Sequence, residues 1–187
     1  MKYVIINKKQ EKGSKSRGYF MKIIFLDIDG VLNSKMYKAS SSKDGYIDLS
    51  RVKHIAEIVN ATDAKIVLIS SLRVDWDKSP ELCGDDGKYI NKCFNKYGLS
   101  IMDKTPYISF FTARRKEIVS WLSVHQNEVE SFVIIDDMQD EWGNLSSRVV
   151  NTNPEGYGLE EVHVKEAIEL LKGRVRFKTK NAEKNNR

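Results

Sequence analysis

The chain has 187 residues, which suits one domain with a hydrophobic core, and its apolar content of 41% is ordinary for a globular protein. No apolar run is long enough to cross a bilayer, which argues against a helical membrane protein. Cys83 and Cys93 stand ten residues apart without a neighbouring Cys or His at the spacing of a zinc site, so we expect free thiols and a cytoplasmic protein.

The net charge of +5 comes from the two ends of the chain. Residues 1–22 carry a net +6 and residues 172–187 another +6, whereas residues 23–171 carry −7. Charge runs of this kind are usually solvated, so we interpret residues 1–20 as a basic extension and 173–187 as a basic tail around one domain over 21–172. The alternative is that these ends bind RNA or DNA by releasing counterions.

Apolar runs and turn signals predict strands that alternate with helices. A short apolar run that ends at Asp27 indicates a buried parallel strand, and a Ser- and Lys-rich loop follows over residues 33–47. The further predicted elements are helix 48–60 (capped by Asp48 or Ser50), strand 65–70, helix 79–97, strand 99–102, helix 114–125, strand 132–135, strand 148–150 and helix 159–171. This order predicts an α/β domain, with a single Rossmann-like parallel sheet of about five strands flanked by helices.

Two carboxylates and a glycine end the first strand. Because side chains alternate along a strand, Asp27 and Asp29 lie on the same side of the emerging chain, where their charges repel by roughly 3 kcal/mol at a separation of about 5 Å. A cation or a proton is needed to offset that repulsion. Gly30 permits a backbone turn closed to other residues, so the loop can approach a small anion. A lone DxDG can also merely cap a turn, so its interpretation depends on partners further along the chain.

Polar residues also end two later strands, with Ser70 and Ser71 after the second and Asp136 and Asp137 after the fourth. Parallel strands end at one edge of the sheet, which is where open α/β sheets bind their ligands. The basic run 114–116 stands at a helix start, where the macrodipole disfavours cations unless an anion is near. Together these groups predict a site for a hard, oxygen-seeking cation and a phosphoryl group.

Other polar and aromatic residues have weaker interpretations. Arg73 is either a contact to the substrate phosphate or an exposed surface cation. Trp76 is either a packing residue or a platform on which a substrate base stacks. The histidines show no base–nucleophile pattern, so surface or core roles are expected for His54, His125 and His163.

Four motifs occur in a fixed order, namely strand-DxDG, strand-Ser, a basic residue before a helix, and strand-DD, in the wording FLDIDGVLN, LISSLR, ARRKEIVSWL and VIIDDMQDEW. This order resembles that of the haloacid dehalogenase (HAD) superfamily, and the resemblance covers roughly residues 22–172. The wording is also similar to the small HAD hydrolases grouped with the phosphatase domains of nucleic-acid repair proteins. In that group a Trp often stands where this chain has Leu72.

The resemblance implies a phosphatase that works through an aspartyl-phosphate. Asp27 would be the nucleophile, and Asp29 would protonate the leaving group and then activate water. Ser70, or the serine after it if the register is shifted by one, would donate a hydrogen bond to the phosphoryl oxygens. The cation that neutralises charge would be Arg114, which suits the small-hydrolase wording, or Lys116, which suits the usual lysine of the superfamily.

The resemblance also implies a Mg²⁺ site at the same edge. Asp137 would bind the ion directly, and the Asp27 carboxylate and the Asp29 backbone carbonyl would complete the protein ligands. Asp136 would orient the basic residue or a metal-bound water, and Asp140 is a weaker outer candidate.

The segments between the motifs are short. About fifteen residues separate the first motif from its helix and about forty follow Ser71, which leaves no room for a full globular cap and predicts an open site. The hypothesis is a Mg²⁺-dependent phosphomonoester hydrolase that acts on a phosphorylated small molecule or a nucleic-acid end, without a membrane partner. The alternative is a non-catalytic protein on a HAD scaffold that docks nucleic acid through its basic tails. The oligomeric state is left open.

Overall fold

The computed structural model describes residues 20–37, 45–108, 114–139 and 142–173, and in this part of the chain five strands form one parallel sheet of order β3-β2-β1-β4-β5. The strands are β1 (Met21–Leu26), β2 (Lys65–Leu68), β3 (Ile101–Lys104), β4 (Val129–Asp136) and β5 (Val149–Asn151). The α-helices are α1 (Leu49–Thr62), α2 (Asp85–Asn95), α3 (Arg114–His125) and α4 (Glu161–Lys172). Three short 3-10 helices are η1 (Ser71–Asp75), η2 (Pro80–Leu82) and η3 (Gly143–Arg148). The predicted α/β architecture is confirmed.

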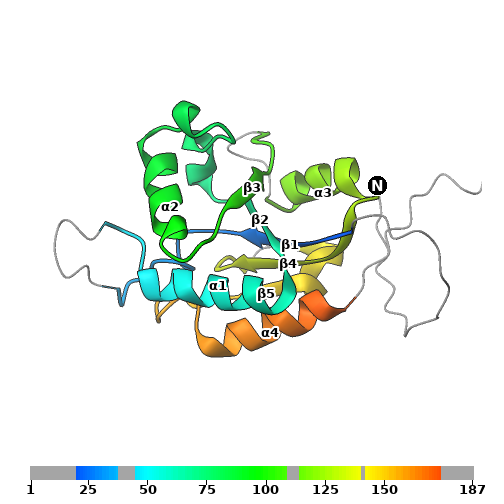
Figure 1. Ribbon diagram of the computed structural model, residues 1–187. Helices are drawn as coiled ribbons and strands as arrows, with labels where there is room; N and C mark the ends of the chain where they lie inside the picture. The colour runs from blue at the N-terminus through cyan, green and yellow to red at the C-terminus, as the bar shows by residue number, and fades with distance from the viewer. Residues whose placement is uncertain (1–19, 38–44, 109–113, 140–141, 174–187) are drawn as a thin grey trace, which may run out of the picture.

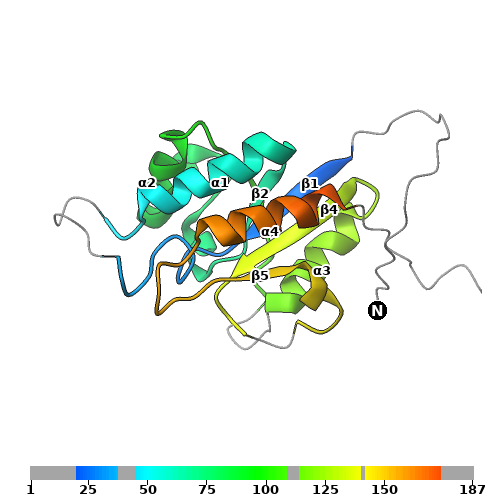
Figure 2. The same cartoon turned by 90° about the horizontal axis from the view of Figure 1, so that it is seen from below.

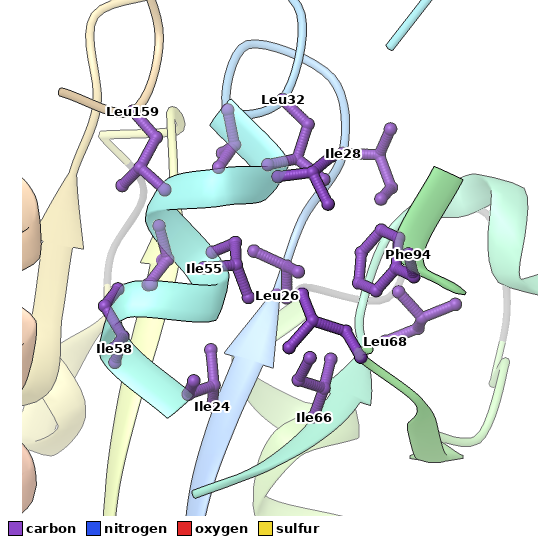
Figure 3. Packing of buried hydrophobic residues seen from close by; sticks show 14 of the residues in the cluster. Ile24, Leu26, Ile28, Leu32, Ile55, Ile58, Ile66, Leu68, Phe94 and Leu159 are labelled. Carbon is purple, nitrogen blue, oxygen red and sulfur yellow. The ribbon is translucent and has the colours of Figure 1, made fainter. Parts of the chain in front are cut away.

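Alternate side chains of each strand pack on opposite faces of the sheet. In β1, Ile24 and Leu26 belong to a core shared with α1, α2 and α4, whereas Ile23 and Phe25 belong to a core shared with α3 and η3. Figure 1 and Figure 2 show α3 on the face opposite α1 and α4. Figure 3 shows the first core, in which Ile55 of α1 packs above the strands. The two layers together bury β1 from Ile23 to Leu26.

The start and end of α1 follow the chemistry of its flanking residues. The Asp48 carboxylate accepts a hydrogen bond from the Ser50 backbone N–H at 2.8 Å, which is an N-cap. Asp63 takes the left-handed conformation with φ 56° and its backbone N–H bonds to the Val59 carbonyl, which closes the helix. Asp48, one of the two predicted caps, is the observed one.

The predicted helix over 79–97 is wrong at its start. Residues 80–82 form the separate helix η2, and α2 begins only at Asp85. The Gly84 backbone N–H donates to the Asp75 carbonyl at 2.8 Å, which turns the chain into α2. A Cβ at Gly87 would lie 2.3 Å from the same carbonyl oxygen, so this close approach of helix and loop requires glycine. The predicted strand 65–70 likewise ends at Leu68, because Ser70 caps η1.

Two further expectations concern the whole of the described chain. Cys83 and Cys93 are both free, as predicted, and both are buried. Among the helices of the described ranges, none has the length and apolar character of a membrane span.

Candidate active site

The pairing of β1 with β4 places two carboxylates side by side. Leu26 pairs with Ile135, and the Asp27 backbone N–H donates to the Ile135 carbonyl at 3.0 Å. Phe25 belongs to the core on the α3 side, so the alternation of side chains directs Asp27 to that side as well. Ile134 of β4 belongs to the same core, so the alternation of side chains directs Asp136 to that side too. Both carboxylates are buried, with 3% of Asp27 and 0% of Asp136 exposed.

Arg114, the first residue of α3, bridges these two carboxylates. Its Nη1 donates to Asp27 Oδ2 at 2.5 Å and also to Asp136 Oδ2. The second oxygen of each carboxylate accepts a backbone N–H, from Ile28 in one case and from Met138 in the other, both at 2.8 Å. Of the two predicted cations, the structure therefore brings Arg114 to the carboxylates. Lys116 is exposed two residues further along the helix.

A third carboxylate joins the pair and makes a possible metal site. One carboxylate oxygen from each of Asp27, Asp136 and Asp137 lies within 4.8 Å of the others. Two unit charges at about 5 Å repel by roughly 3 kcal/mol at an effective dielectric near 20, and a single arginine cannot offset three of them. Carboxylate oxygens are the ligands that Mg²⁺ prefers, so the donor set fits such an ion.

The electrostatics of the cluster point the same way. Burial raises the pKa of Asp27 and the pKa of Asp137, in each case against the opposing charge of Arg114. Burial and then the negative charge of Asp27 raise the pKa of Asp136 to about 6. Burial alone would lower the pKa of Arg114, but the two carboxylates outweigh it and raise that pKa. Burial thus disfavours the ionised forms of these carboxyl groups, and a divalent cation would offset that cost.

The loop after β1 sets the third carboxylate in place. Gly30 has φ +70°, and a Cβ there would lie 2.1 Å from Asp137 Oδ2, so both backbone conformation and space require glycine. Its N–H donates to Asn33 Oδ1 and the Asn33 amide donates to Asp29 Oδ1, each at 2.9 Å. Thr152 Oγ1 donates to the Gly30 carbonyl at 3.0 Å. Asp29 is exposed at the rim, where Asn33 holds its carboxylate.

Asn33 was not predicted as a site residue, although it stands four residues after Asp29 in the first motif. An asparagine side chain can bond its own loop in this way, which is the signal that could have identified it.

The two predicted serines occupy different environments. Ser70 is fully buried, and its Oγ accepts the Leu72 N–H at 3.3 Å as the cap of η1. The neighbouring Ile69 N–H donates to the Leu26 carbonyl at 3.0 Å, so Ser70 lies beside the end of β1. Ser71 is exposed. Of the two serines, Ser70 is therefore the one that lies beside the acidic end of β1.

Arg73 is buried next to Ser70 and is already bound to protein groups. Its five N–H donors are occupied by a carboxylate and by four backbone carbonyls, those of Ile69, Ser70, Thr105 and Pro106. The carboxylate is that of Glu117, one turn along α3 from Arg114, and the two charged groups meet at 2.5 Å with both side chains buried. This leaves no donor of Arg73 for a substrate phosphate, and we assign it to support of the site.

Glu117 is the functional neighbour that sequence reasoning missed. In α3 the Glu117 side chain is buried together with Ile118 and Leu122, whereas the apolar Val119 is only half-buried. Acids are rarely buried unless they are paired with a cation. An acid on the core side of this helix, together with an arginine just after Ser70, could therefore have indicated the ion pair.

The remaining candidates lie in local contacts. Trp76 is buried and its Nε1 donates to Asn91 Oδ1 at 3.0 Å, so its ring is not free to stack on a base. His54, His125 and His163 contact groups of their own helices or caps. Asp140 lies outside the described residues, as do residues 38–44 and 109–113, on which the predicted openness of the site partly depends.

A comparison with known families matches this architecture. The model of the HAD domain in Swiss Army Knife RNA repair proteins matches residues 23–164, from β1 into α4, which includes every motif described above. No curated protein and no solved structure matches the chain. The chain therefore belongs to the family of HAD domains in Swiss Army Knife RNA repair proteins, and with it to the HAD superfamily of hydrolases.

Proposed function

We propose that this protein is a Mg²⁺-dependent phosphomonoester hydrolase in which Asp27 is the nucleophile. The observation that carries the proposal is the position of the Asp27 carboxylate, buried at the end of β1, bound by Arg114 and within 4.8 Å of two further carboxylates. Phosphoryl transfer needs positioning and charge neutralisation more than elaborate covalent machinery, and these groups supply both.

In the first step, a carboxylate oxygen of Asp27 attacks the phosphorus atom. A new O–P bond forms, the bond from phosphorus to the leaving oxygen breaks, and its electron pair goes to that oxygen. Asp29, exposed at the rim and held by Asn33, gives its proton to the leaving oxygen as general acid. The product is an aspartyl-phosphate on Asp27 and a free alcohol.

In the second step, water hydrolyses the aspartyl-phosphate. The Asp29 carboxylate takes a proton from the water, whose oxygen attacks phosphorus. The bond between Asp27 and phosphorus breaks, which releases inorganic phosphate and restores the carboxylate. Arg114 and the hydroxyl of Ser70 donate hydrogen bonds to the phosphoryl oxygens through both steps.

Mg²⁺ would be held by the carboxylates of Asp27 and Asp137 and by the Asp29 backbone carbonyl. Bound there, the ion supplies positive charge to the phosphoryl group. The role of Asp136 is to hold Arg114 in place, which its direct contact with the guanidinium supports.

The family description supports a substrate class. Because the matched domain is described from RNA repair proteins, we favour the terminal phosphate of an RNA strand over a free nucleotide. A non-catalytic role through basic tails concerns residues 1–20 and 173–187, of which the structure describes only residues 20 and 173. The complete set of Asp27, Asp29, Ser70 and Asp137 favours catalysis over binding alone.

The test is turnover of an aryl phosphate with and without Mg²⁺, followed by a screen of nucleotides and of 3′- and 5′-phosphorylated RNA oligonucleotides. Asp27→Asn is expected to lose turnover while it keeps its fold by circular dichroism and thermal melting. The matched control is Asp63→Asn, because this exposed aspartate has the left-handed conformation that asparagine also adopts. Full activity of Asp27→Asn would contradict the proposal.

A further inference from the structure

The outer face of α2 carries a row of three lysines. Lys88, Lys92 and Lys96 are exposed and spaced four residues apart, with Lys96 as the residue that ends the helix. Positions four apart lie above one another on a helix, about 6 Å apart along its axis. Residues 88–96 contain no acid, although residues 23–171 carry a net −7. The row is therefore a local concentration of positive charge on an acidic domain.

These lysines differ from Lys165 and Lys172, two exposed lysines of α4 that lie beside carboxylates. On α4, Lys165 lies 2.9 Å from Glu161 and Lys172 lies 2.8 Å from Glu169. Within the described residues, no ion pair joins any member of the α2 row to a carboxylate. Like charges four residues apart on a helix repel one another, and an extended anion bound along the row would offset the repulsion between the three ammonium groups.

The row borders a depression of about 530 Å³ in the surface, lined by Pro80, Lys88, Asn91, Lys92, Asn95 and Lys96. Its lining combines ammonium groups with side-chain amides, and none of these six residues is acidic. Lysine and asparagine side chains are among the groups that bind the phosphates and sugars of a nucleic-acid backbone.

The helix that carries the row is fixed near the candidate active site. It belongs to the crossover that begins with Ser70, and the Gly84 backbone N–H before it donates to the Asp75 carbonyl of η1 at 2.8 Å. Tyr46, in the loop before α1, donates to Asp86 in the first turn of α2 at 2.9 Å. The start of α2 is thus tied to η1, which begins just after β2 ends, and to the loop before α1, and the row begins at Lys88, one turn after this start.

We infer that Lys88, Lys92 and Lys96 bind the phosphodiester backbone of a single-stranded polynucleotide whose terminal phosphate enters the site at Asp27. This inference rests on the proposed function and adds the surface that selects a polynucleotide end over a free nucleotide. The contacts are electrostatic, so they carry little base specificity, and they weaken as the salt concentration rises because counterion release then gains less free energy.

The test is a triple variant, Lys88→Gln/Lys92→Gln/Lys96→Gln, in the full chain. The probe is a fluorescein-labelled single-stranded RNA of mixed sequence with a 3′- or 5′-phosphate, and binding is followed by anisotropy from low to high salt. If three phosphate contacts are lost, the slope of log K against log salt becomes less steep by about 2, since each contact to a single strand contributes about 0.7. The KM for phosphorylated RNA is expected to rise, with kcat/KM for an aryl phosphate unchanged.

The matched control is Lys53→Gln/Lys165→Gln/Lys172→Gln, which removes three exposed lysines and the same net charge. It is expected to keep the salt slope of the parent. The inference is overturned if the parent does not bind the RNA, if the α2 variant keeps the parent slope, or if both triple variants lose it equally. Failure of the proposed function is a separate result, because it appears as absence of aryl phosphate turnover in the parent protein.

Discussion

The bridge that Arg114 makes between Asp27 and Asp136 predicts a pH-dependent loss of stability when the arginine is removed. Burial and the charge of Asp27 already raise the pKa of Asp136 from 3.8 to about 6, a change worth about 3 kcal/mol. With Arg114→Gln the repulsion of the two carboxylates, roughly 3 kcal/mol at about 5 Å, has no neighbouring cation to offset it. We therefore expect the pKa of Asp136 to rise above about 6 in the variant.

The sign follows from proton binding. A carboxyl whose pKa is raised by folding holds its proton longer in the folded state, so its contribution to stability is full at low pH and is lost as pH rises through the folded value. For the parent protein without metal, this loss runs from pH 3.8 to about 6. In Arg114→Gln this loss of stability continues to higher pH, because Asp136 keeps its proton longer. The free energy of unfolding of the variant is therefore expected to be lower than that of the parent by about 3 kcal/mol at pH 8 and by much less at pH 5.

Urea unfolding in EDTA at both pH values measures this difference. The matched control is Lys116→Gln, which removes one exposed positive charge from the same helix and is expected to change stability by less than about 0.5 kcal/mol. A deficit of Arg114→Gln that is equal at pH 5 and pH 8 would refute the reasoning, because it would show that the arginine stabilises by packing and not by neutralising carboxylates.

Three other perturbations have expected outcomes. Gly30→Ala is expected to reduce the rise in Tm produced by Mg²⁺, because its Cβ would meet Asp137 Oδ2 at 2.1 Å. The control is Gly98→Ala, where φ is a similar +68° but no atom lies within 4 Å of the added Cβ. This control is expected to keep the rise in Tm. Glu117→Gln leaves Arg73 buried without its carboxylate and is expected to lower the urea unfolding free energy by about 3–5 kcal/mol, a result that an unchanged midpoint would contradict. Mg²⁺ is expected to raise Tm more at pH 8 than at pH 5, since the clustered carboxylates have raised pKa values and must lose protons to bind the ion, and an equal rise at both would argue against this site.

Much of the fold is encoded in local patterns. The apolar run before Asp27 and the run 132–135 are strands because their residues are buried on both faces of a parallel sheet. The helix over 114–125 and the cap at Asp48 also follow from nearby residues alone. The start of α2 does not, because it depends on the approach of Gly84 and Gly87 to a carbonyl of η1 that no local pattern reveals.

The site shows the same division between local and tertiary information. That Asp27 and Asp136 meet follows from the rule that parallel strands end at one edge of the sheet. The choice between Arg114 and Lys116 needed the phase of α3 against the sheet, since both stand in the same first turn. The occupation of Arg73 by Glu117 needed the packing of α3 against the segment after β2, and sequence spacing alone carries no information on that contact.

The account depends most directly on a phosphoryl group being carried by Asp27. A variant Asp29→Asn, in which the second step lacks its general base, is mixed with Mg²⁺ and an aryl phosphate, quenched in acid, reduced with borohydride and digested for mass spectrometry. We predict a modified peptide that contains Asp27, which forms at the rate of aryl alcohol release. Turnover without modification of Asp27, or modification of a different residue, would contradict the account.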